Sequence, residues 1–325
     1  MGDKTKISWA DATVNTWRGC SKVSAGCRSC YAIGQVAGLA RKMGGVNPTA
    51  AARFDGLVKD GNWTGVVRLD KEHLLQPLRW GRPRKIFINS LSDTFHENVP
   101  FEHIAALFGV MRAARHHRFL VLTKRPQRAL EFFAWLDAQD PGNAGAQACS
   151  CSWHLTNIDE TGFAEKYAPV GGYDTNSKTM WPLPNVHIGV SVEDQEACDV
   201  RVPLLIKIPA AVKFLSMEPL LSPVDLTASF CVQDKNGEYS DARLKPGGGC
   251  VIDQVIVGAE SGPTFRPMNL DWARSIRDQC LEAGVAYFYK QSSGRKSGTD
   301  PHLDGLVYHQ FPGDLAPPTP YTGVK

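Results

Sequence analysis

The chain has 325 residues, of which 43% are hydrophobic, so it can bury the core of one barrel-sized domain or of two ordinary ones. Its 36 Lys and Arg residues nearly balance 33 Asp and Glu residues, and the formal net charge of +3 neither requires nor excludes a polyanionic partner. An odd count of nine cysteines, with no apolar run of membrane-spanning length, argues against secretion and membrane insertion. We expect a soluble cytoplasmic protein with reduced thiols and no membrane partner.

The first feature along the chain is a loop with three closely spaced cysteines, Cys20, Cys27 and Cys30. A structural zinc site needs four ligands, so zinc would require Cys149, Cys151 or a histidine to complete the set. A 4Fe–4S cluster can instead be held by three thiolates from one loop, which leaves one iron open to another ligand. We therefore expect a metal site here and favour the cluster over zinc.

Six short apolar runs with strong β propensity follow the cysteine loop, and helical patterns separate several of them. The runs are 85–90, 118–123, 185–192, 212–217, 253–260 and 285–290. In the segments 101–117 and 270–284 apolar residues recur every three to four positions, and Gly284 marks a helix end. This alternation predicts an α/β fold with a parallel sheet, arranged as a complete or partial barrel of six or seven βα units.

Two polar stretches interrupt the alternation, at residues 137–184 and 228–249. Loops of this length without periodicity are usually functional lids or disordered insertions. We expect both to be insertions into a single domain that spans residues 1–325, with a loose, proline-rich tail at 313–325 and the first insertion as a candidate lid. The cysteines of the two insertions are Cys149, Cys151 and Cys231.

Polar side chains follow every one of the six apolar runs. The carboxyl ends of the strands carry the chemistry in β/α barrels, so these side chains are candidate site residues. Contact with solvent explains any one of them better than a functional role does, but their recurrence at all six ends favours a functional site. In chain order the candidates are Asn89, Ser90, Ser92, Asp93, Lys124, Arg125, Ser191, Glu193, Arg201, Glu218, Gly258, Glu260 and Lys290.

Basic residues gather in three short runs, at 79–85, 112–118 and 124–128, despite the small net charge. Ordinary solvated faces and a nucleic-acid surface explain such runs equally well. A basic groove near the strand ends would favour the nucleic-acid surface.

The three-cysteine loop followed by a β/α barrel resembles the radical SAM superfamily, in which the commonest loop is CxxxCxxC rather than the CxxxxxxCxxC of this chain. The chain is more specifically similar to a bacteriophage-encoded family of radical SAM-like proteins known by its three-cysteine motif. The matching stretches are "GCSKVSAGCRSCYA", "DTFHENVP", "VLTKRPQR", "GVSVEDQ", "KFLSMEPLL", "VIVGAESGPTFRPM", "RDQCLEAGVAYFYKQ" and "LDGLVYHQFP". The resemblance implies a partial (β/α)6–7 barrel of the radical SAM type that binds a 4Fe–4S cluster and S-adenosylmethionine.

The resemblance implies roles for two groups of residues, and the strand ends supply a third group. The cluster ligands are Cys20, Cys27 and Cys30. The groups that surround S-adenosylmethionine are Tyr31, Asn89, Ser90, Ser92, Asp93, Ser191, Glu193, Arg201 and Gly258. The catalytic or substrate-binding groups are Lys124, Arg125, Glu218, Glu260 and Lys290.

Phage relatives of this kind are associated with hypermodified thymidine, in which a glycine joined through nitrogen to the thymine methyl is isomerised to attachment through its α-carbon. We expect this chain to be a radical SAM isomerase of the same kind, acting in the host-cell cytoplasm with an external electron donor such as flavodoxin. A 5′-deoxyadenosyl radical would abstract the glycyl α-hydrogen, and Lys124, Arg125 or Lys290 would bind the free carboxylate. The modified base would be flipped out of DNA, with the basic runs gripping phosphate.

Two alternatives stay open from the sequence. One keeps the radical SAM chemistry but acts on another nucleobase, nucleotide or peptide. The other is a zinc-stabilised, non-enzymatic nucleic-acid-binding protein, which the metal content would distinguish.

Overall fold

The computed structural model describes residues 5, 7–44, 51–142, 144, 148, 151, 155, 181–230 and 250–323. Most of both predicted insertions, with Cys149 and Cys231, therefore lies outside the described residues. The chain groups into two units. Unit 1 comprises Met1–Val23, Cys30–His187 and Ile208–Ala211, and unit 2 comprises Ser24–Ser29, Ile188–Lys207 and Val212–Lys325.

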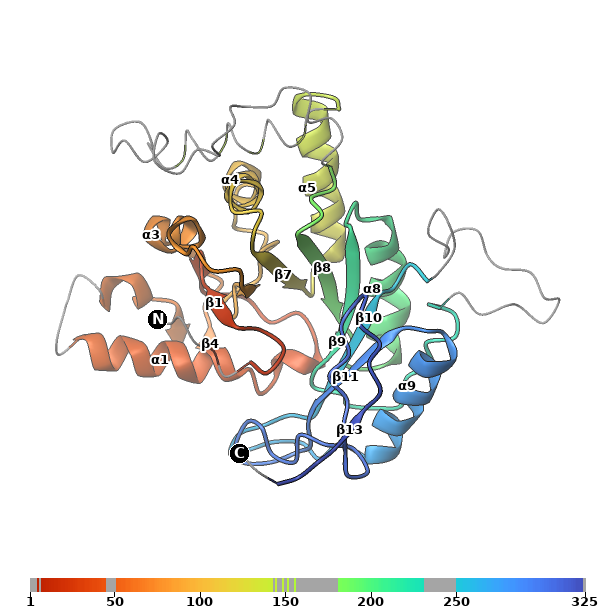
Figure 1. Ribbon diagram of the computed structural model, residues 1–325. Helices are drawn as coiled ribbons and strands as arrows, with labels where there is room; N and C mark the ends of the chain where they lie inside the picture. Colours follow the sequence, from red (N-terminus) through yellow and green to blue (C-terminus); the bar gives the residue numbers. More distant parts are fainter. Residues whose placement is uncertain are drawn as a thin grey trace. The chain divides into compact units, whose positions relative to one another are not determined.

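The sheet of unit 1 consists of parallel strands in the order β1-β6-β7, followed by the start of β8 (Figure 1). Their bounds are β1 Ala12–Val14, β6 Lys85–Ile88, β7 Arg118–Thr123 and β8 Val186–Ser191. Ala12 pairs with Ile86 and Lys85 with Arg118, so the three strands begin at one edge and end at the other. This parallel arrangement places the residues that follow β6 and β7 at the same edge.

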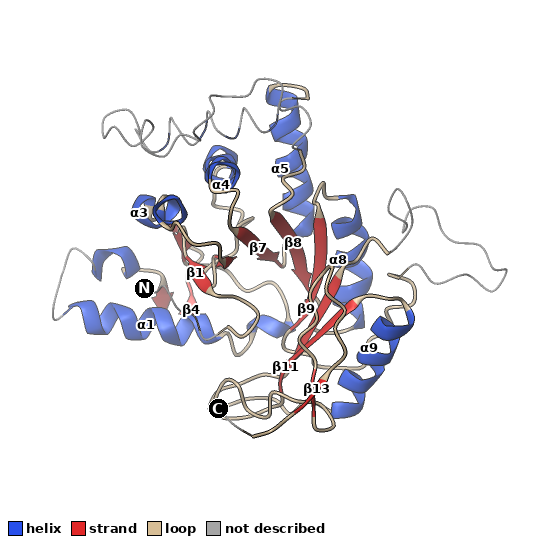
Figure 2. Cartoon of the chain, in the orientation of Figure 1, coloured by secondary structure: helices blue, strands red, loops and turns tan. Residues whose placement is uncertain are grey.

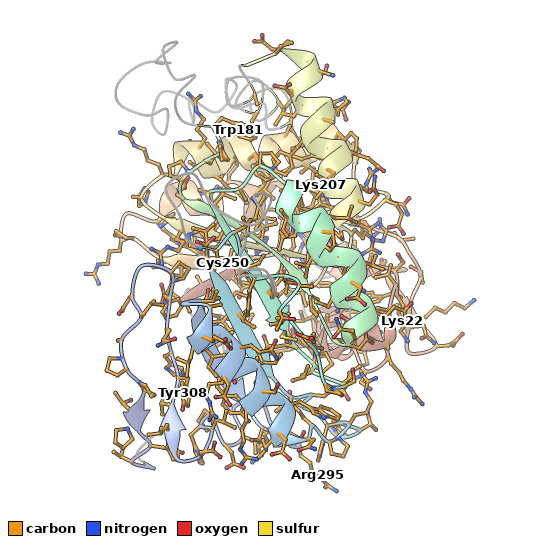
Figure 3. The ribbon with its side chains drawn as sticks, turned by 90° about the vertical axis from the view of Figure 1, so that its right-hand side faces the viewer. Lys22, Trp181, Lys207, Cys250, Arg295 and Tyr308 are labelled. Carbon is orange, nitrogen blue, oxygen red and sulfur yellow. The ribbon has the colours of Figure 1, made fainter. Side chains whose placement is uncertain are left out.

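Two helices, α4 (Phe101–Ala113) and α5 (Pro126–Gln139), follow β6 and β7 and pack against each other in unit 1. Aromatic rings fill their interface, where the ring centroids of Phe108 and Phe132 are 5.4 Å apart. Trp181, labelled in Figure 3, joins the same cluster 6.1 Å from Phe108. This core supports the turns from which Asp93 and Arg125 project.

Unit 1 also contains short elements on either side of the cysteine loop, near the start of the chain. These are β2 Trp17–Arg18, α1 Tyr31–Gly44, η2 Ala52–Phe54, β3 Val58–Lys59, β4 Asn62–Trp63, β5 Arg68–Leu69, α3 Lys71–Leu74 and η3 Gln76–Arg79. β2 pairs antiparallel with β5, and β3 with β4. The apolar face of α1 buries Ala32 and Val36 against Phe54, Leu57 and Leu91, which fixes the helix that begins directly after Cys30.

Unit 2 contains the remainder of the sheet, in the order β8-β9-β10-β11 (Figure 2). Its elements are η1 Ala25–Cys27, α8 Gln195–Lys207, β9 Val212–Met217, β10 Gln254–Gly258, α9 Leu270–Glu282, β11 Ala286–Gln291, β12 Leu306–Val307 and β13 Thr319–Pro320. β10 pairs parallel with both β9 and β11, and all five of its residues are buried, as in a sheet covered on both faces. In the predicted tail, β13 pairs with β12.

The predicted alternation of strands and helices is confirmed. Each of the six apolar runs forms a strand, from β6 to β11, and the two helical patterns form α4 and α9. Gly284 follows α9 with a φ of 65°, a left-handed conformation that suits glycine at a helix end. The chain is thus a mixed α/β protein with a seven-stranded sheet, compatible with a partial β/α barrel.

No helix in the described ranges is both long enough and apolar enough to span a membrane.

Candidate functional site

The first cysteine of the loop is held in unit 1 by Arg125, the second residue after β7. The guanidinium of Arg125 donates to Asp93 Oδ2 at 3.2 Å, to Glu97 Oε2 at 2.8 Å and to Ser21 Oγ at 2.7 Å. Its Nη1 also lies 3.9 Å from the sulfur of Cys20. The Arg125 side chain is only 9% exposed, so these contacts use a guanidinium largely removed from water. Arg125 therefore joins the cysteine loop to the carboxyl ends of β6 and β7.

Asp93 is the second centre of this network. Besides Arg125, its carboxylate accepts from Thr123 Oγ1 at 2.7 Å, from the backbone N–H of Lys124 at 3.0 Å and from that of Phe95 at 2.9 Å. A buried carboxylate with several donors and a cation is well satisfied. Asp93 thus fixes the turns after β6 and β7 relative to each other.

Asn89 and Ser92 hold the chain just before Cys20. Asn89 follows β6 with a φ of 60°, and its Oδ1 accepts from the backbone N–H and the hydroxyl of Thr16, both at 2.8 Å. Ser92 Oγ donates to the carbonyl of Gly19 at 2.6 Å. Gly19 has a φ of 97°, and a Cβ there would collide with the backbone oxygen of Val66. The approach to Cys20 thus depends on a glycine and on two polar side chains that sequence analysis assigned to cofactor binding.

Tyr31 contacts the turn after β6 through Ser90. The hydroxyl of Tyr31 donates to the carbonyl of Ser90 at 3.1 Å, and Ser90 Oγ donates to Asn15 Oδ1 at 3.2 Å. The Tyr31 ring is exposed although its hydroxyl is bonded. This contact joins the first residue of α1, next to Cys30, to the turn after β6.

A buried ion pair, Arg18–Asp70, holds the residues that come just before the cysteine loop. Arg18 Nη1 donates to Asp70 Oδ2 at 2.6 Å, and both side chains are buried. His73 Nδ1 lies 2.9 Å from the same oxygen, and Arg53 Nη1 lies 3.3 Å from it. Burial alone would raise the pKa of Asp70, but hydrogen bonds from His73 and Arg18 hold it well below its usual range. The loop therefore starts from a fixed, charged anchor.

In unit 2 a buried pair follows β8. Arg201 Nη1 donates to Glu193 Oε2 at 2.8 Å and to the carbonyl of Ser191 at 2.7 Å. The Glu193 side chain is 1% exposed, and its Oε1 accepts from the backbone N–H of Gly26 at 3.4 Å. Ser191, Glu193 and Arg201, which were expected to surround S-adenosylmethionine, are thus brought together. Glu193 also binds the segment that carries Cys27.

A second ion pair, Arg266–Glu260, follows β10 and holds Ala25, the residue before Gly26. Arg266 donates to Glu260 through Nη2 at 2.7 Å and Nε at 3.0 Å, a two-pronged arrangement. Arg266 Nη1 also donates to the carbonyl of Ala25 at 3.1 Å. Burial alone would raise the pKa of Glu260, but the hydrogen bonds from Arg266 lower it, so the carboxylate is ionised.

The third pair of unit 2 keeps access to solvent. Lys290 Nζ, at the end of β11, lies 2.7 Å from Glu218 Oε1, which follows β9. The two side chains are 19% and 13% exposed. On the intervening strand β10, a Cβ at Gly258 would lie 2.6 Å from Glu218 Oε1, so a glycine leaves room for the carboxylate. Both side chains of this pair are thus partly exposed, whereas the carboxylates Glu193 and Glu260 of the other two pairs are buried.

The three cysteines are half-buried free thiols, with Cys20 and Cys30 in unit 1 and Cys27 in unit 2. Burial and the nearby Asp93 raise the pKa of the Cys20 thiol to about 12, while Arg125 acts in the opposite direction. Within the described ranges, no group of three or more His, Cys, Asp or Glu side chains is placed to hold a metal ion. The donor chemistry nevertheless fits an iron–sulfur cluster, because the loop offers soft thiols and Arg125 directs an N–H at one of the sulfurs.

Both partners of three strand-end ion pairs were predicted as candidates from the sequence, namely Arg125–Asp93, Arg201–Glu193 and Lys290–Glu218. Arg266 and Glu97 were not candidates, although both lie within stretches quoted for the resemblance. Ser21 and the Arg18–Asp70 pair were also missed, because each acts through a partner distant in the sequence. Only the formation of the fold brings these groups together.

The chain was compared with known protein families, curated proteins and solved structures. The model of a family described as "Protein of unknown function (DUF5131)" matches residues 4–312. No curated protein and no solved structure matches the chain.

Proposed function

We propose that this chain, which belongs to the DUF5131 family, is a radical SAM enzyme whose 4Fe–4S cluster is held by Cys20, Cys27 and Cys30. The observation that carries the proposal is the contact of Arg125 with Cys20, which places a buried cation beside the first thiol of a three-cysteine loop. A cation next to a cluster thiolate offsets its negative charge and orients it. Bound there, the cluster and S-adenosylmethionine would supply hydrogen-atom abstraction by a carbon-centred radical.

The chain's own residues would hold the loop in shape. In unit 1, Arg125 and Asn89 fix the residues around Cys20. In unit 2, Glu193 binds the backbone N–H of Gly26, and Arg266 binds the carbonyl of Ala25. A ligand loop held by charged groups is what a cluster site needs, because the ligands must keep their geometry when the cluster changes charge.

We assign the candidate cations to two different tasks. Arg125 is committed to Asp93, Glu97 and the cysteine loop, so we assign it to positioning Cys20 rather than to a substrate carboxylate. Lys290 is paired with Glu218 but partly exposed, and a substrate carboxylate can replace Glu218 as its partner. We propose Lys290 as the substrate-binding cation and Glu218 as the carboxylate that holds the Lys290 ammonium group in position before the substrate binds.

For the substrate, we propose thymidine in DNA whose thymine methyl carries a glycine joined through the glycine nitrogen, which is isomerised to attachment through the glycine α-carbon. Such a shift is redox-neutral overall. It requires a bound carboxylate, a site closed to water and an extruded base. An external donor such as flavodoxin would supply the electron that primes the cluster.

Formation of 5′-deoxyadenosine tests the proposal. Full-length protein, reconstituted anaerobically with iron and sulfide and then reduced, is incubated with S-adenosylmethionine and glycyl-thymidine DNA. We expect 5′-deoxyadenosine and the isomerised base from the wild type and neither from Cys27→Ala. Cys151→Ser is the matched control, since the zinc interpretation makes Cys151 a candidate ligand and the cluster proposal does not. The reaction assignment is wrong if reconstituted protein makes neither product, and the substrate is another compound if 5′-deoxyadenosine forms without the isomer.

A further inference from the structure

Two of the three basic runs are joined into one surface at the amino ends of β6 and β7 in unit 1. Lys85 begins β6, Arg118 begins β7, and the two pair directly in the sheet. The backbone N–H of Arg118 also donates to the carbonyl of Arg84 at 2.9 Å. Residues more than thirty positions apart in the sequence thus meet at the edge where both strands start.

Side chains strengthen this junction. His116 Nε2 lies 2.7 Å from the carbonyl of Trp80, and His117 Nε2 lies 3.0 Å from that of Pro77. The Arg84 guanidinium lies over the Trp80 ring, 4.5 Å from its centroid. Histidines of the run 112–118 therefore hold the backbone just before and within the run 79–85, and the two runs form a single structure.

The amino-edge basic surface gathers seven cationic side chains from the two runs. It consists of Arg79, Arg82, Arg84, Lys85, Arg112, Arg115 and Arg118. Neither run contains Asp or Glu. Asp11 lies beside it, where its Oδ2 accepts from the backbone N–H of Lys85 at 2.7 Å, and Asp137 and Asp140 stand at the end of α5.

The concentration of like charge costs stability. Like charges directly opposite each other on neighbouring strands are destabilising, and Lys85 faces Arg118. Burial lowers the pKa of Lys85 and Arg118 lowers it further, while Asp11 acts against them. Burial lowers the pKa of His117, and His116 and Arg84 contribute to the same shift. A bound polyanion would relieve this repulsion.

We propose that the amino-edge basic surface binds the phosphate backbone of a nucleic acid. Six of its seven cations are arginine, whose planar fork pairs with phosphate in a bidentate manner. Arg79, Arg82, Arg115 and Arg118 are exposed, so phosphates can reach them. A spread of guanidinium groups over two chain segments matches a repeating phosphate chain better than a single small anion.

The surface is remote from the proposed reaction site. The four residues of β6, at about 3.3 Å each, separate Lys85 from the turn that carries Asp93 by about 13 Å. Only the third basic run, at 124–128, lies at the carboxyl ends. Nucleic-acid binding at this surface depends on the proposed function in one respect, namely that the nucleic acid carries the substrate. Binding here anchors the nucleic acid and needs neither cluster nor S-adenosylmethionine.

Fluorescence anisotropy tests the anchor. The full chain, as purified, is titrated onto labelled single- and double-stranded DNA and RNA of about 20 nucleotides, between about 50 and 200 mM salt. The variant is the triple substitution Arg82→Gln, Arg115→Gln and Arg118→Gln. Its control is Lys42→Gln, Lys59→Gln and Lys71→Gln, which removes the same charge from exposed positions of unit 1.

We expect the arginine variant to bind about tenfold or more weakly than the control, and its slope of log K against log salt to fall by about two to three. Equal binding by variant and control overturns the proposal, as does a wild type that binds anionic lipid vesicles but no nucleic acid. Thermal unfolding checks the fold, and if the triple variant is unfolded, Arg115→Gln alone must still reduce the slope by about one.

The iron content separates this inference from the proposed reaction. A chain that binds nucleic acid through these arginines but takes up no iron retains the anchor and loses the radical chemistry. A chain that assembles the cluster but shows no arginine-dependent binding retains the chemistry and loses the anchor.

Discussion

Replacing Arg125 with glutamine removes the cation that joins Cys20 to the strand ends of unit 1. Asp93 then keeps its backbone and hydroxyl donors but loses its charged partner, and Glu97 loses its 2.8 Å ion pair. The Asp93 side chain is 8% exposed, so its carboxylate cannot recover its hydration. The substitution therefore leaves a buried charge uncompensated beside the Cys20 thiol.

The size of the effect follows from burial. Breaking a buried ion pair by removing one partner costs about 3–5 kcal/mol. At roughly 2.1 cal/mol/K per residue, a 325-residue chain that unfolds as one transition has an unfolding entropy of about 0.7 kcal/mol/K, so its midpoint should fall by roughly 4–7 °C. Arg125→Lys keeps the positive charge but loses the planar guanidinium, so its unfolding midpoint should lie between those of Arg125→Gln and the wild type.

Two assays read this out. Calorimetry gives the midpoint, and iron and sulfide analysis with redox titration of the reconstituted protein reports the cluster. We expect Arg125→Gln to bind less iron and to show a lower reduction potential, because a cation near the cluster favours the added electron. Arg41→Gln, on the exposed end of α1, removes the same charge and should change neither quantity. An Arg125→Gln protein with wild-type midpoint, iron content and potential would refute the reasoning.

Three further predictions concern other parts of the fold. Folding lowers the pKa of Asp70, so the stability that its ionised carboxylate contributes is fully present above the unfolded pKa of about 3.9 and is lost as the pH falls toward the lower folded pKa. Asp70→Asn should therefore lower the urea midpoint at pH 7 and flatten the dependence of that midpoint on pH below about 4. Gly189→Ala should destabilise the chain by about 1–3 kcal/mol, because a Cβ there would lie 2.5 Å from the ring of Phe214, and urea unfolding measures this. Lys290→Met should raise KM for a carboxylate-bearing substrate about tenfold with a smaller effect on kcat, whereas an unchanged KM would remove Lys290 from substrate binding.

The strands were predictable from sequence because they are short, apolar and rich in β-branched or aromatic residues, as the fully buried β10 shows. The short strand β1 was not among the predicted runs, since three residues carry too little pattern to separate from a loop. Its role as an edge of the sheet depends on pairing with β6, more than seventy positions later.

The site residues were predictable as polar strand ends but not in their contacts. Asn89 and Ser92 stand where ligand contacts were expected, yet their side chains bind the backbone and side chains around Cys20. Arg266 lies six positions after Glu260 on a turn without regular structure, so no periodicity indicates that the two meet. Long-range pairing, which the sequence does not encode locally, decides which polar groups stay available to a ligand.

The role of the two basic runs at 79–85 and 112–118 could not be decided from the sequence either. Sequence alone left an ordinary solvated surface and a nucleic-acid surface equally supported. The pairing of Lys85 with Arg118 places both runs at the edge away from Asp93, which separates an anchoring role from the reaction site.

Metal content and the spectrum of the reduced protein test whether Cys20, Cys27 and Cys30 hold an iron–sulfur cluster. The full chain is purified and reconstituted without oxygen, then analysed for iron, sulfide and zinc and by electron paramagnetic resonance with and without S-adenosylmethionine. We expect about four irons and four sulfides per chain, and a cluster signal that changes when S-adenosylmethionine binds and is absent in Cys27→Ala. A colourless protein with about one zinc per chain and no cluster signal would contradict this expectation.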